Sequence, residues 1–422
     1  MAVDEVRSAS GGATETPSLP QPSRFIARQP ILNLHGEVVA YELLSRHGWE
    51  NWFSGEPDEA TRQTLDHCLC VGLETLTDRM PAFVHCTRES LVGKLAMLLP
   101  PATTVLEVAE TIEPDAELLQ ACTELRKLGY RLALDNFSPR PELQSLVEIA
   151  DYIKVDFRSS DAYVRRQIQR MTRYSSALLV AEKLEDRDQF NIAHAEHFTF
   201  FQGYFFCRPA IIANRQIPSN RMNYLRVLTE LTRQPMNLTE VTRLVELEES
   251  LCYRLLRLTN SASLGIGSEV TSVRGALMLV GEDRFRTLVS VAASCVLGRN
   301  QAPALTSLSL ERARFCELLA SRIGEDPGEQ FLLGLLSLVD AMLETTMESV
   351  VQHLPLRKQA KAALLGAINP ASVPLCLIRS FESGAWGNCS GAAIDLGIGE
   401  ETLAGVYMEA VKWAAETVAA NR

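Results

Sequence analysis

Short apolar runs alternate with amphipathic stretches in the first half of the chain. The runs, between positions 24 and 209, are FIARQPILNL, VVAYELLSR, AFVHCT, TVLEVAE, RLALDN, YIKVDF, ALLVAEKLE and FTFFQGYFF. Most are separated by segments with apolar residues at helical spacing, such as DAELLQACTELRKLGY. Repeated β-α units predict parallel strands with helical crossovers, and this number of units favours a closed, TIM-like α/β barrel. The tight turn HGE joins the first two runs, so we expect the first strand to be antiparallel.

Only helical periodicity remains after Pro209. The segment TEVTRLVELEESLCYRLLRLTN places its apolar residues at helical spacing, and VRGALMLVG ends in Gly281 as a capped helix does. The first residues of the chain are small, polar and rich in Pro and Gly, which is typical of a disordered tail. We therefore expect a tail over residues 1–22, a barrel domain over 23–213 and an all-α helical domain over 214–422.

Composition limits the partners that this chain can bind. The net charge of −11 at pH 7 argues against binding to nucleic acid or to an anionic membrane surface. No run of about eighteen apolar residues occurs, so we expect no membrane span. The ten cysteines are scattered and form no C-x-x-C pair, which indicates reduced thiols rather than disulfides or a zinc site. Together these features predict a cytoplasmic protein.

Polar residues recur at or near the carboxyl ends of the predicted strands. In a parallel barrel these ends meet at one rim, which holds the active site of nearly every such enzyme. Acids gathered there would repel one another unless a cation bound them, and oxygen ligands suit Mg²⁺ or Mn²⁺. Two such ions, about 4 Å apart, can activate water and clamp a phosphodiester. The residues concerned are Glu42, Glu107, Asp135, Lys154, Asp156, Glu182 and Gln202.

A structural role is the alternative for each of these positions. A single acid at a strand end is more often a helix N-cap or a solvated loop residue than a metal ligand. Taken alone, none of the seven therefore supports a site. Seven polar residues at the same place on successive strands are much harder to explain by capping, and we interpret the set as one site.

The same residues carry a resemblance to the EAL domain, a barrel family that hydrolyses the bacterial messenger cyclic di-GMP. YELLSR resembles the family's E-x-L-x-R motif, and LEVAE resembles its E-x-x-E element. LDNF stands where the family has D-D-F-G, and IKVD where it has K-x-D. AEKLE stands in place of A-E-G-V-E, and QGYFFCRP matches Q-G-Y-x-x-x-x-P. Order and spacing agree over about 185 residues.

The resemblance implies a role for each matching position. Glu42, Glu107 and Asp135 would hold metal, Glu182 would be the general base, and Lys154 would orient the attacking water.

Further positions would surround the ligand. Arg46 would meet a phosphate of the ligand as a planar cationic fork, and Asp156 and Gln202 would also contact the ligand. Glu110 would brace the loop after the LDNF strand, and Glu185 would support the pocket.

Three departures from the family pattern affect this site. His85, in AFVHCT, replaces an asparagine ligand, and imidazole favours softer ions than Mg²⁺. Asn136 replaces the second acid of D-D-F-G and offers a carbonyl oxygen without charge, so it would be a weakened ligand of the second cation. Pro139 and Pro141 stand in a loop that is normally glycine-rich, and they stiffen it. We therefore expect weak catalysis or none.

The helical half resembles the HDOD domain, a relative of the HD phosphohydrolase fold that lacks the catalytic dyad. The resemblance rests on RLTNSA, residues 257–262, followed by a helix that ends in LVG. His353 is the single histidine after residue 214, and no His-Asp dipeptide occurs in the chain, so the sequence argues against a hydrolase site of the HD type here. HDOD domains act through protein contacts, which implies a protein partner.

Three hypotheses follow for the whole chain. The first is a signalling protein whose degenerate barrel binds cyclic di-GMP, or only partner proteins, while the helical domain relays the state to a partner. The second is a working, metal-dependent cyclic di-GMP phosphodiesterase with an altered metal preference. In the third the barrel is a scaffold without nucleotide, and Arg46 is a structural ion-pair partner. A homodimer is compatible with all three.

Overall fold

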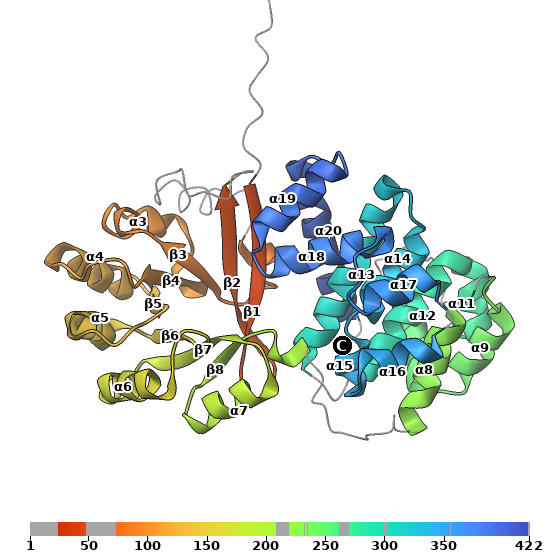
Figure 1. The fold of residues 1–422 in the computed structure, drawn as a ribbon, viewed down its shortest axis with the longest axis horizontal. Helices are drawn as coiled ribbons and strands as arrows, with labels where there is room; N and C mark the ends of the chain where they lie inside the picture. Colours follow the sequence, from red (N-terminus) through yellow and green to blue (C-terminus); the bar gives the residue numbers. More distant parts are fainter. Residues whose placement is uncertain are drawn as a thin grey trace, which may run out of the picture.

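Eight strands close into a barrel, and helices make up the rest of the structure, a computed structural model (Figure 1). The structure describes residues 24–47, 73–207, 219–231, 233, 235–260, 270–298, 302–354 and 356–420. The tail predicted over 1–22 lies outside these ranges.

The strands follow one another around the barrel in sequence order. They are β1 (Arg24–Leu32), β2 (Val38–His47), β3 (Ala82–Cys86), β4 (Thr104–Ala109), β5 (Arg131–Asp135), β6 (Tyr152–Asp156), β7 (Leu178–Leu184) and β8 (Phe200–Gly203). From β2 to β8 neighbours pair in parallel, whereas β1 is antiparallel to both β2 and β8. The predicted barrel and its antiparallel first strand are therefore confirmed.

Amphipathic helices connect the parallel strands. They are α2 (Leu73–Leu76), α3 (Arg88–Val92), α4 (Ala116–Lys127), α5 (Gln144–Ile149), α6 (Ala162–Thr172) and α7 (Arg187–Ala195). In α4, Asp115 caps the first turn by accepting a hydrogen bond from the Leu118 amide, and Leu118, Cys122 and Leu125 are buried on one face. The strand that precedes this helix, TVLEVA, is buried along almost its whole length, as a strand covered on both sides must be.

An apolar layer fills the inside of the barrel. Because side chains alternate between the two faces of a strand, each inward residue is followed two positions later by another inward residue. The layer consists of Ile31, Ala40, Phe83, Val105, Ala133 and Val180, with Tyr152 and Phe200 packed against it. It forms a floor beneath the rim of the barrel.

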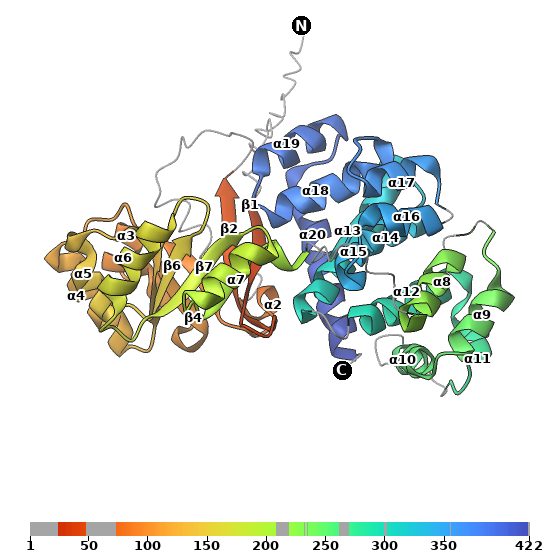
Figure 2. The same cartoon turned by 60° about the horizontal axis from the view of Figure 1, so that its bottom comes forward.

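The second half is helical, as the sequence predicts. Its helices are α8 (Ser219–Leu231), α9 (Leu238–Glu246), α10 (Glu249–Thr259), α11 (Val273–Val280), α12 (Glu282–Leu297), α13 (Pro303–Ile323), α14 (Pro327–Leu336), α15 (Val339–Leu343), α16 (Met347–His353), α17 (Lys358–Leu364), α18 (Val373–Glu382), α19 (Trp386–Asp395) and α20 (Glu400–Ala420). The helices share two apolar cores, and α18 and α20 also contact β1 (Figures 1 and 2). Among the described residues, no helix combines the length and apolar character that a membrane crossing requires.

Candidate functional site

Seven polar side chains meet above the apolar floor at the rim of the barrel. Each lies two positions after a residue of the floor on the same strand, so the alternation of the strands turns it inward. The parallel register also places His85 beside Glu107 and aligns the strand ends that carry the others. The seven are Glu42, His85, Glu107, Asp135, Lys154, Glu182 and Gln202, on β2 to β8 in that order.

Lys154 is the central cation of this cluster. Its ammonium nitrogen, which is fully buried, lies 2.5 Å from a carboxylate oxygen of Glu107 and 2.8 Å from one of Glu182. Glu42 and Asp135 each place an oxygen 3.2 Å from the same nitrogen. Burial alone would lower the pKa of Lys154, but the surrounding carboxylates outweigh it and hold that pKa well above its usual range. The lysine is therefore charged.

His85 is a second cation on the solvent side of the cluster. Its Nε2 lies 3.2 Å from Glu42 and 3.4 Å from Glu107, and its Nδ1 lies 3.7 Å from Asp135. Burial would lower the pKa of the imidazole, but Glu107, Glu42 and Asp135 raise it to about 10. Gln202 donates a further hydrogen bond to Glu42.

The acids differ in their affinity for a proton. Burial, with a contribution from Glu42, raises the pKa of Glu107 to about 7, although Lys154 opposes it. Burial also raises the pKa of Glu182 to about 8, and Asp135 adds to that effect. Burial would also raise the pKa of Glu42, but Lys154 and His85 outweigh it and hold that pKa well below its usual range. Two carboxyls are thus poised to take up a proton near neutral pH.

A divalent cation fits the donors at this rim. Glu42, His85 and Glu107 each offer a ligand atom, and these atoms all lie within 4.8 Å of one another. Oε2 of Glu107 is buried and accepts no hydrogen bond, so a ligand atom is available. When every group is charged, four carboxylates face only two cations, Lys154 and His85. The donors are oxygen and imidazole nitrogen, a set that suits Mn²⁺ as well as Mg²⁺.

Proton release on metal binding is the first testable consequence. Since the pKa of His85 is raised to about 10, the imidazole carries its proton at pH 8, and it must lose that proton to ligate a metal. We expect calorimetric titration with Mn²⁺ at pH 8, in buffers of different ionisation enthalpy, to show about one proton released per ion. His85→Asn is the control and should release fewer protons; equal release by both proteins would remove His85 from the ligand set.

Asn136 lies in the turn after β5 and contacts Glu110. Its backbone adopts a left-handed conformation, with φ of 46°, which asparagine tolerates better than most residues. The Asn136 amide donates to one oxygen of Glu110 at 3.0 Å, and the Ser138 hydroxyl donates to the other at 2.9 Å. Arg140 donates to the Glu110 carbonyl. Glu110 thus holds this turn, and the role of Asn136 as a weak metal ligand stays a prediction.

Asp156 lies beside the cluster and forms a separate ion pair. Its carboxylate accepts a hydrogen bond from Lys183 at 2.7 Å and one from the Arg158 amide at 2.8 Å. Lys183 occupies an irregularity of β7, with φ of 56°, at the position where the motif of the resembled family has glycine. The neighbouring Gly203 is indispensable, because a Cβ there would lie 2.2 Å from a backbone oxygen of Leu184.

Two other predicted residues are not among the seven side chains of the cluster. Glu185 is exposed after β7, and its backbone amide donates to the Gln189 side chain at 2.8 Å. Arg46 belongs to β2, opposite Phe25 of β1, but its side chain lies outside the described part of the structure. The roles of both in ligand binding stay predictions.

Gln29 is a site residue that the sequence reasoning missed. It lies opposite Glu42 in the β1–β2 pair, and its side-chain oxygen accepts a hydrogen bond from Gln202 at 2.7 Å. The same amide group of Gln202 also donates to Glu42. The signal was available, since Gln29 stands two positions before Ile31 of the apolar floor on an antiparallel strand.

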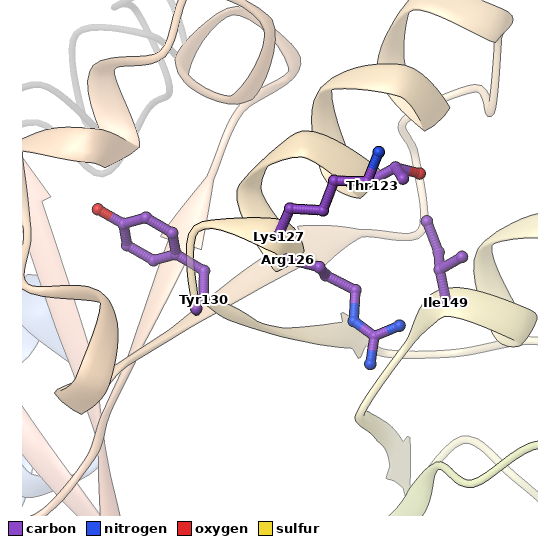
Figure 3. Close-up of a pocket in the computed structure, with 6 residues that line it drawn as sticks. Thr123, Arg126, Lys127, Tyr130 and Ile149 are labelled. Carbon is purple, nitrogen blue, oxygen red and sulfur yellow. The ribbon is translucent and has the colours of Figure 1, made fainter.

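A pocket of about 330 Å³ lies elsewhere on the barrel (Figure 3). Its lining comes from the end of α4, the residues before β5 and the end of α5, including Arg126, Lys127, Tyr130 and Ile149. Arg126 pairs with Asp151 at 2.9 Å. This pocket lies near the amino end of β5, at the opposite rim from the acid cluster, and is separate from the candidate site.

Comparison with known proteins identifies the class. The EAL domain model matches residues 85–209, and the HDOD domain model matches 217–367. The chain therefore belongs to the family in which an EAL domain is followed by an HDOD domain. It is 34% identical over 402 residues to the uncharacterised protein YuxH of Bacillus subtilis, covering 92% of this chain and 97% of YuxH.

A second relative carries a functional name. The chain is 33% identical over 396 residues to the cyclic di-GMP phosphodiesterase CdgJ of Vibrio cholerae, covering 92% of each protein. Solved structures similar to the chain include the PaMucR phosphodiesterase in complex with c-di-GMP (TM-score 0.38, 20% identity, 47% of this chain and 99% of that one). Another is Bacillus subtilis YkuI, with an EAL domain, in complex with substrate c-di-GMP and calcium (TM-score 0.38, 20% identity, 64% and 72%).

Proposed function

We propose that this chain is a cyclic di-GMP signalling protein whose barrel binds the nucleotide through a divalent cation and hydrolyses it slowly or not at all. The observation that carries the proposal is the convergence of Glu42, His85 and Glu107, with ligand atoms within 4.8 Å of one another. The family and the relative CdgJ, named as a cyclic di-GMP phosphodiesterase, support the choice of nucleotide.

In this proposal the acid cluster holds the ion and the nucleotide phosphates lie above it. Glu42, His85, Glu107 and Asp135 would be the ligands, and Mn²⁺ would be preferred to Mg²⁺ because one ligand is imidazole. A bound ion would neutralise charge on a phosphodiester oxygen and acidify water. Gln202 orients Glu42 through its hydrogen bond and so helps to shape the ligand set.

Weak turnover follows from the turn after β5. A second cation needs a second charged ligand, and Asn136 provides only an amide, which is bonded to Glu110. Asn136→Asp would supply that charge, and because a carboxylate cannot donate to Glu110 and is repelled by it, the side chain would be released from its present contact. The prolines of SPRP further limit how closely this loop can approach a ligand.

An active phosphodiesterase is the second candidate, and one contact favours it. Glu182 lies 2.8 Å from Lys154, and its pKa of about 8 suits a group that exchanges protons with water near neutral pH. In that case Glu182 would be the general base and Lys154 would hold the water.

A hydrolysis assay with Mn²⁺ or Mg²⁺ separates the two candidates. We expect the unaltered protein to convert cyclic di-GMP to the linear dinucleotide slowly, at well below one turnover per second, and Asn136→Asp to raise the rate about tenfold. Glu182→Gln is the control for the mechanism and should abolish any turnover. Rapid hydrolysis by the unaltered protein, with a loss in Glu182→Gln, would establish the second candidate instead.

The remaining parts of the chain take supporting roles in the proposal. Residues 23–213 would form the nucleotide-binding domain, and residues 214–422 would pass its state to a protein partner, in a monomer or a homodimer. The cysteines of the described part are all free thiols, which supports a reducing, cytoplasmic environment.

A further inference from the structure

The outer face of β1 is covered by the helical half of the chain. In a barrel of β-α units, the helix that follows each strand covers the outer face of the sheet there. β1 has no such helix, because it runs directly into β2 through the turn at residues 33–37. Helices α18 and α20 occupy this side of the barrel (Figures 1 and 2). Leu43 and Val84 of the barrel share an apolar cluster with Met408 of α20. The two halves are thus joined along the hairpin.

A buried arginine forms the polar centre of this interface. Arg28 of β1 is only 6% exposed, and its guanidinium donates to Glu311 of α13 at 2.7 Å. It also donates to Asp78 at 2.9 Å and stacks on the Tyr41 ring, with 4.4 Å to the ring centroid. The Tyr407 hydroxyl of α20 lies 3.4 Å from the Arg28 amide. One side chain therefore binds the barrel and the helical half together.

Glu311 is held in a rigid part of the helical half. It is 5% exposed, and the next residue, Arg312, forms a two-pronged pair with Glu382 of α18 at 2.7 and 2.8 Å. Arg312 also donates to Ser337 at 3.1 Å. Because Glu311 and Arg312 are adjacent on α13, a movement of α13 that breaks the Arg312–Glu382 pair would also displace Glu311.

The inner face of β1 leads to the acid cluster. Residues alternate along a strand, so Arg28 points outward and the next residue, Gln29, points into the barrel. Gln29 accepts a hydrogen bond from Gln202, and Gln202 also donates to Glu42. Glu311 is thus connected to Glu42 through the ion pair with Arg28, the adjacent residue Gln29, and the two hydrogen bonds that Gln202 donates to Gln29 and to Glu42.

We propose that the Arg28–Glu311 pair couples the helical domain to the metal site, so that the packing of α13 sets the position of β1 and with it the cation affinity at Glu42. Arg28 and Glu311 are positioning residues in this scheme and do not contact the ion. A protein partner that shifts the helical core would change nucleotide binding in the barrel through this pair. The inference rests on the proposed function, because it requires the cluster to bind a cation.

Glu311→Gln tests the coupling. The variant keeps the shape of the side chain but removes its charge, so that Arg28 keeps the Asp78 carboxylate and the Leu76 carbonyl as partners within the barrel and loses its ion pair with α13. We expect the Mn²⁺ dissociation constant, measured by electron paramagnetic resonance, to rise about tenfold. Hydrogen exchange of the β1 amides should become faster in the same variant. The matched control is Glu196→Gln, which breaks a pair of Glu196 and Arg165 within the barrel and should leave Mn²⁺ affinity unchanged.

Arg28→Lys is a milder substitution that tests the same coupling if Glu311→Gln does not fold. Lysine keeps the charge but cannot reach Glu311 and Asp78 together, so we expect a rise of the Mn²⁺ dissociation constant of about threefold. A folded variant with faster exchange in β1 but unaltered Mn²⁺ affinity would overturn the coupling and leave the proposed function intact. Failure of the unaltered protein to bind Mn²⁺ would overturn both.

Discussion

Lys154→Met is expected to cause a large loss of stability in the metal-free protein. The ammonium group is fully buried and lies within 3.2 Å of four carboxylates, which are left to repel one another when it is removed. Breaking a buried ion pair from one side costs roughly 3–5 kcal/mol. Urea denaturation in the presence of a chelator measures the free energy of unfolding. Added Mn²⁺ should restore part of it, because the ion replaces the lost positive charge.

Lys183→Met is the matched control for this substitution. Lys183 also pairs with an acid, Asp156, at 2.7 Å, but its side chain is 45% exposed. Half-exposed pairs contribute about 0–1 kcal/mol, so this variant should unfold close to the unaltered protein. If the two lysine variants lose the same stability, the cluster does not depend on Lys154 for charge compensation.

Glu107→Gln is expected to weaken metal binding strongly without destabilising the metal-free protein at pH 8. Glu107 is completely buried and has a ligand oxygen that accepts no hydrogen bond, so losing its charge should lower Mn²⁺ affinity about a hundredfold. The free energy of unfolding of the metal-free protein should rise rather than fall in this variant. Since the folded-state pKa of Glu107 is raised from 4.5 to about 7, its ionisation costs folding free energy that grows between these two pH values and is fully present at pH 8, and Gln removes that cost.

The measurement combines a Mn²⁺ titration with urea denaturation at pH 8. Glu230→Gln is the control, because Glu230 of α8 is also buried, 8% exposed, but belongs to the helical half. It should leave Mn²⁺ affinity unaltered. Equal Mn²⁺ affinities for Glu107→Gln and the unaltered protein would show that Glu107 is not a ligand.

The candidate site was predictable because its signal is local and periodic. On several strands an apolar residue of the floor stands two positions before an acid of the cluster. The pairs are Val105 and Glu107, Ala133 and Asp135, and Val180 and Glu182. An inward apolar residue followed by an inward polar one is visible in the sequence, and closure of the barrel then brings the polar residues together. The barrel with its antiparallel first strand and the helical second half followed from the same kind of pattern.

The contacts that the sequence did not reveal are those between distant positions. Arg28 and Glu311 are 283 positions apart, and nothing in either segment points to the other. The resemblance implied that Glu110 braces the loop after β5, but the sequence does not show that the turn directs the Asn136 amide to Glu110. Such contacts depend on tertiary packing, which propensity and periodicity do not encode.

A calorimetric titration with cyclic di-GMP, in Mn²⁺ and again in a chelator, tests the central claim most directly. The account predicts saturable binding at one site per chain in Mn²⁺ and binding at least tenfold weaker without metal. Without the ion, the four carboxylates of the cluster outnumber its two cations, Lys154 and His85, and the excess negative charge faces the phosphates. Equal affinity in the two solutions, or no binding in Mn²⁺, would contradict it.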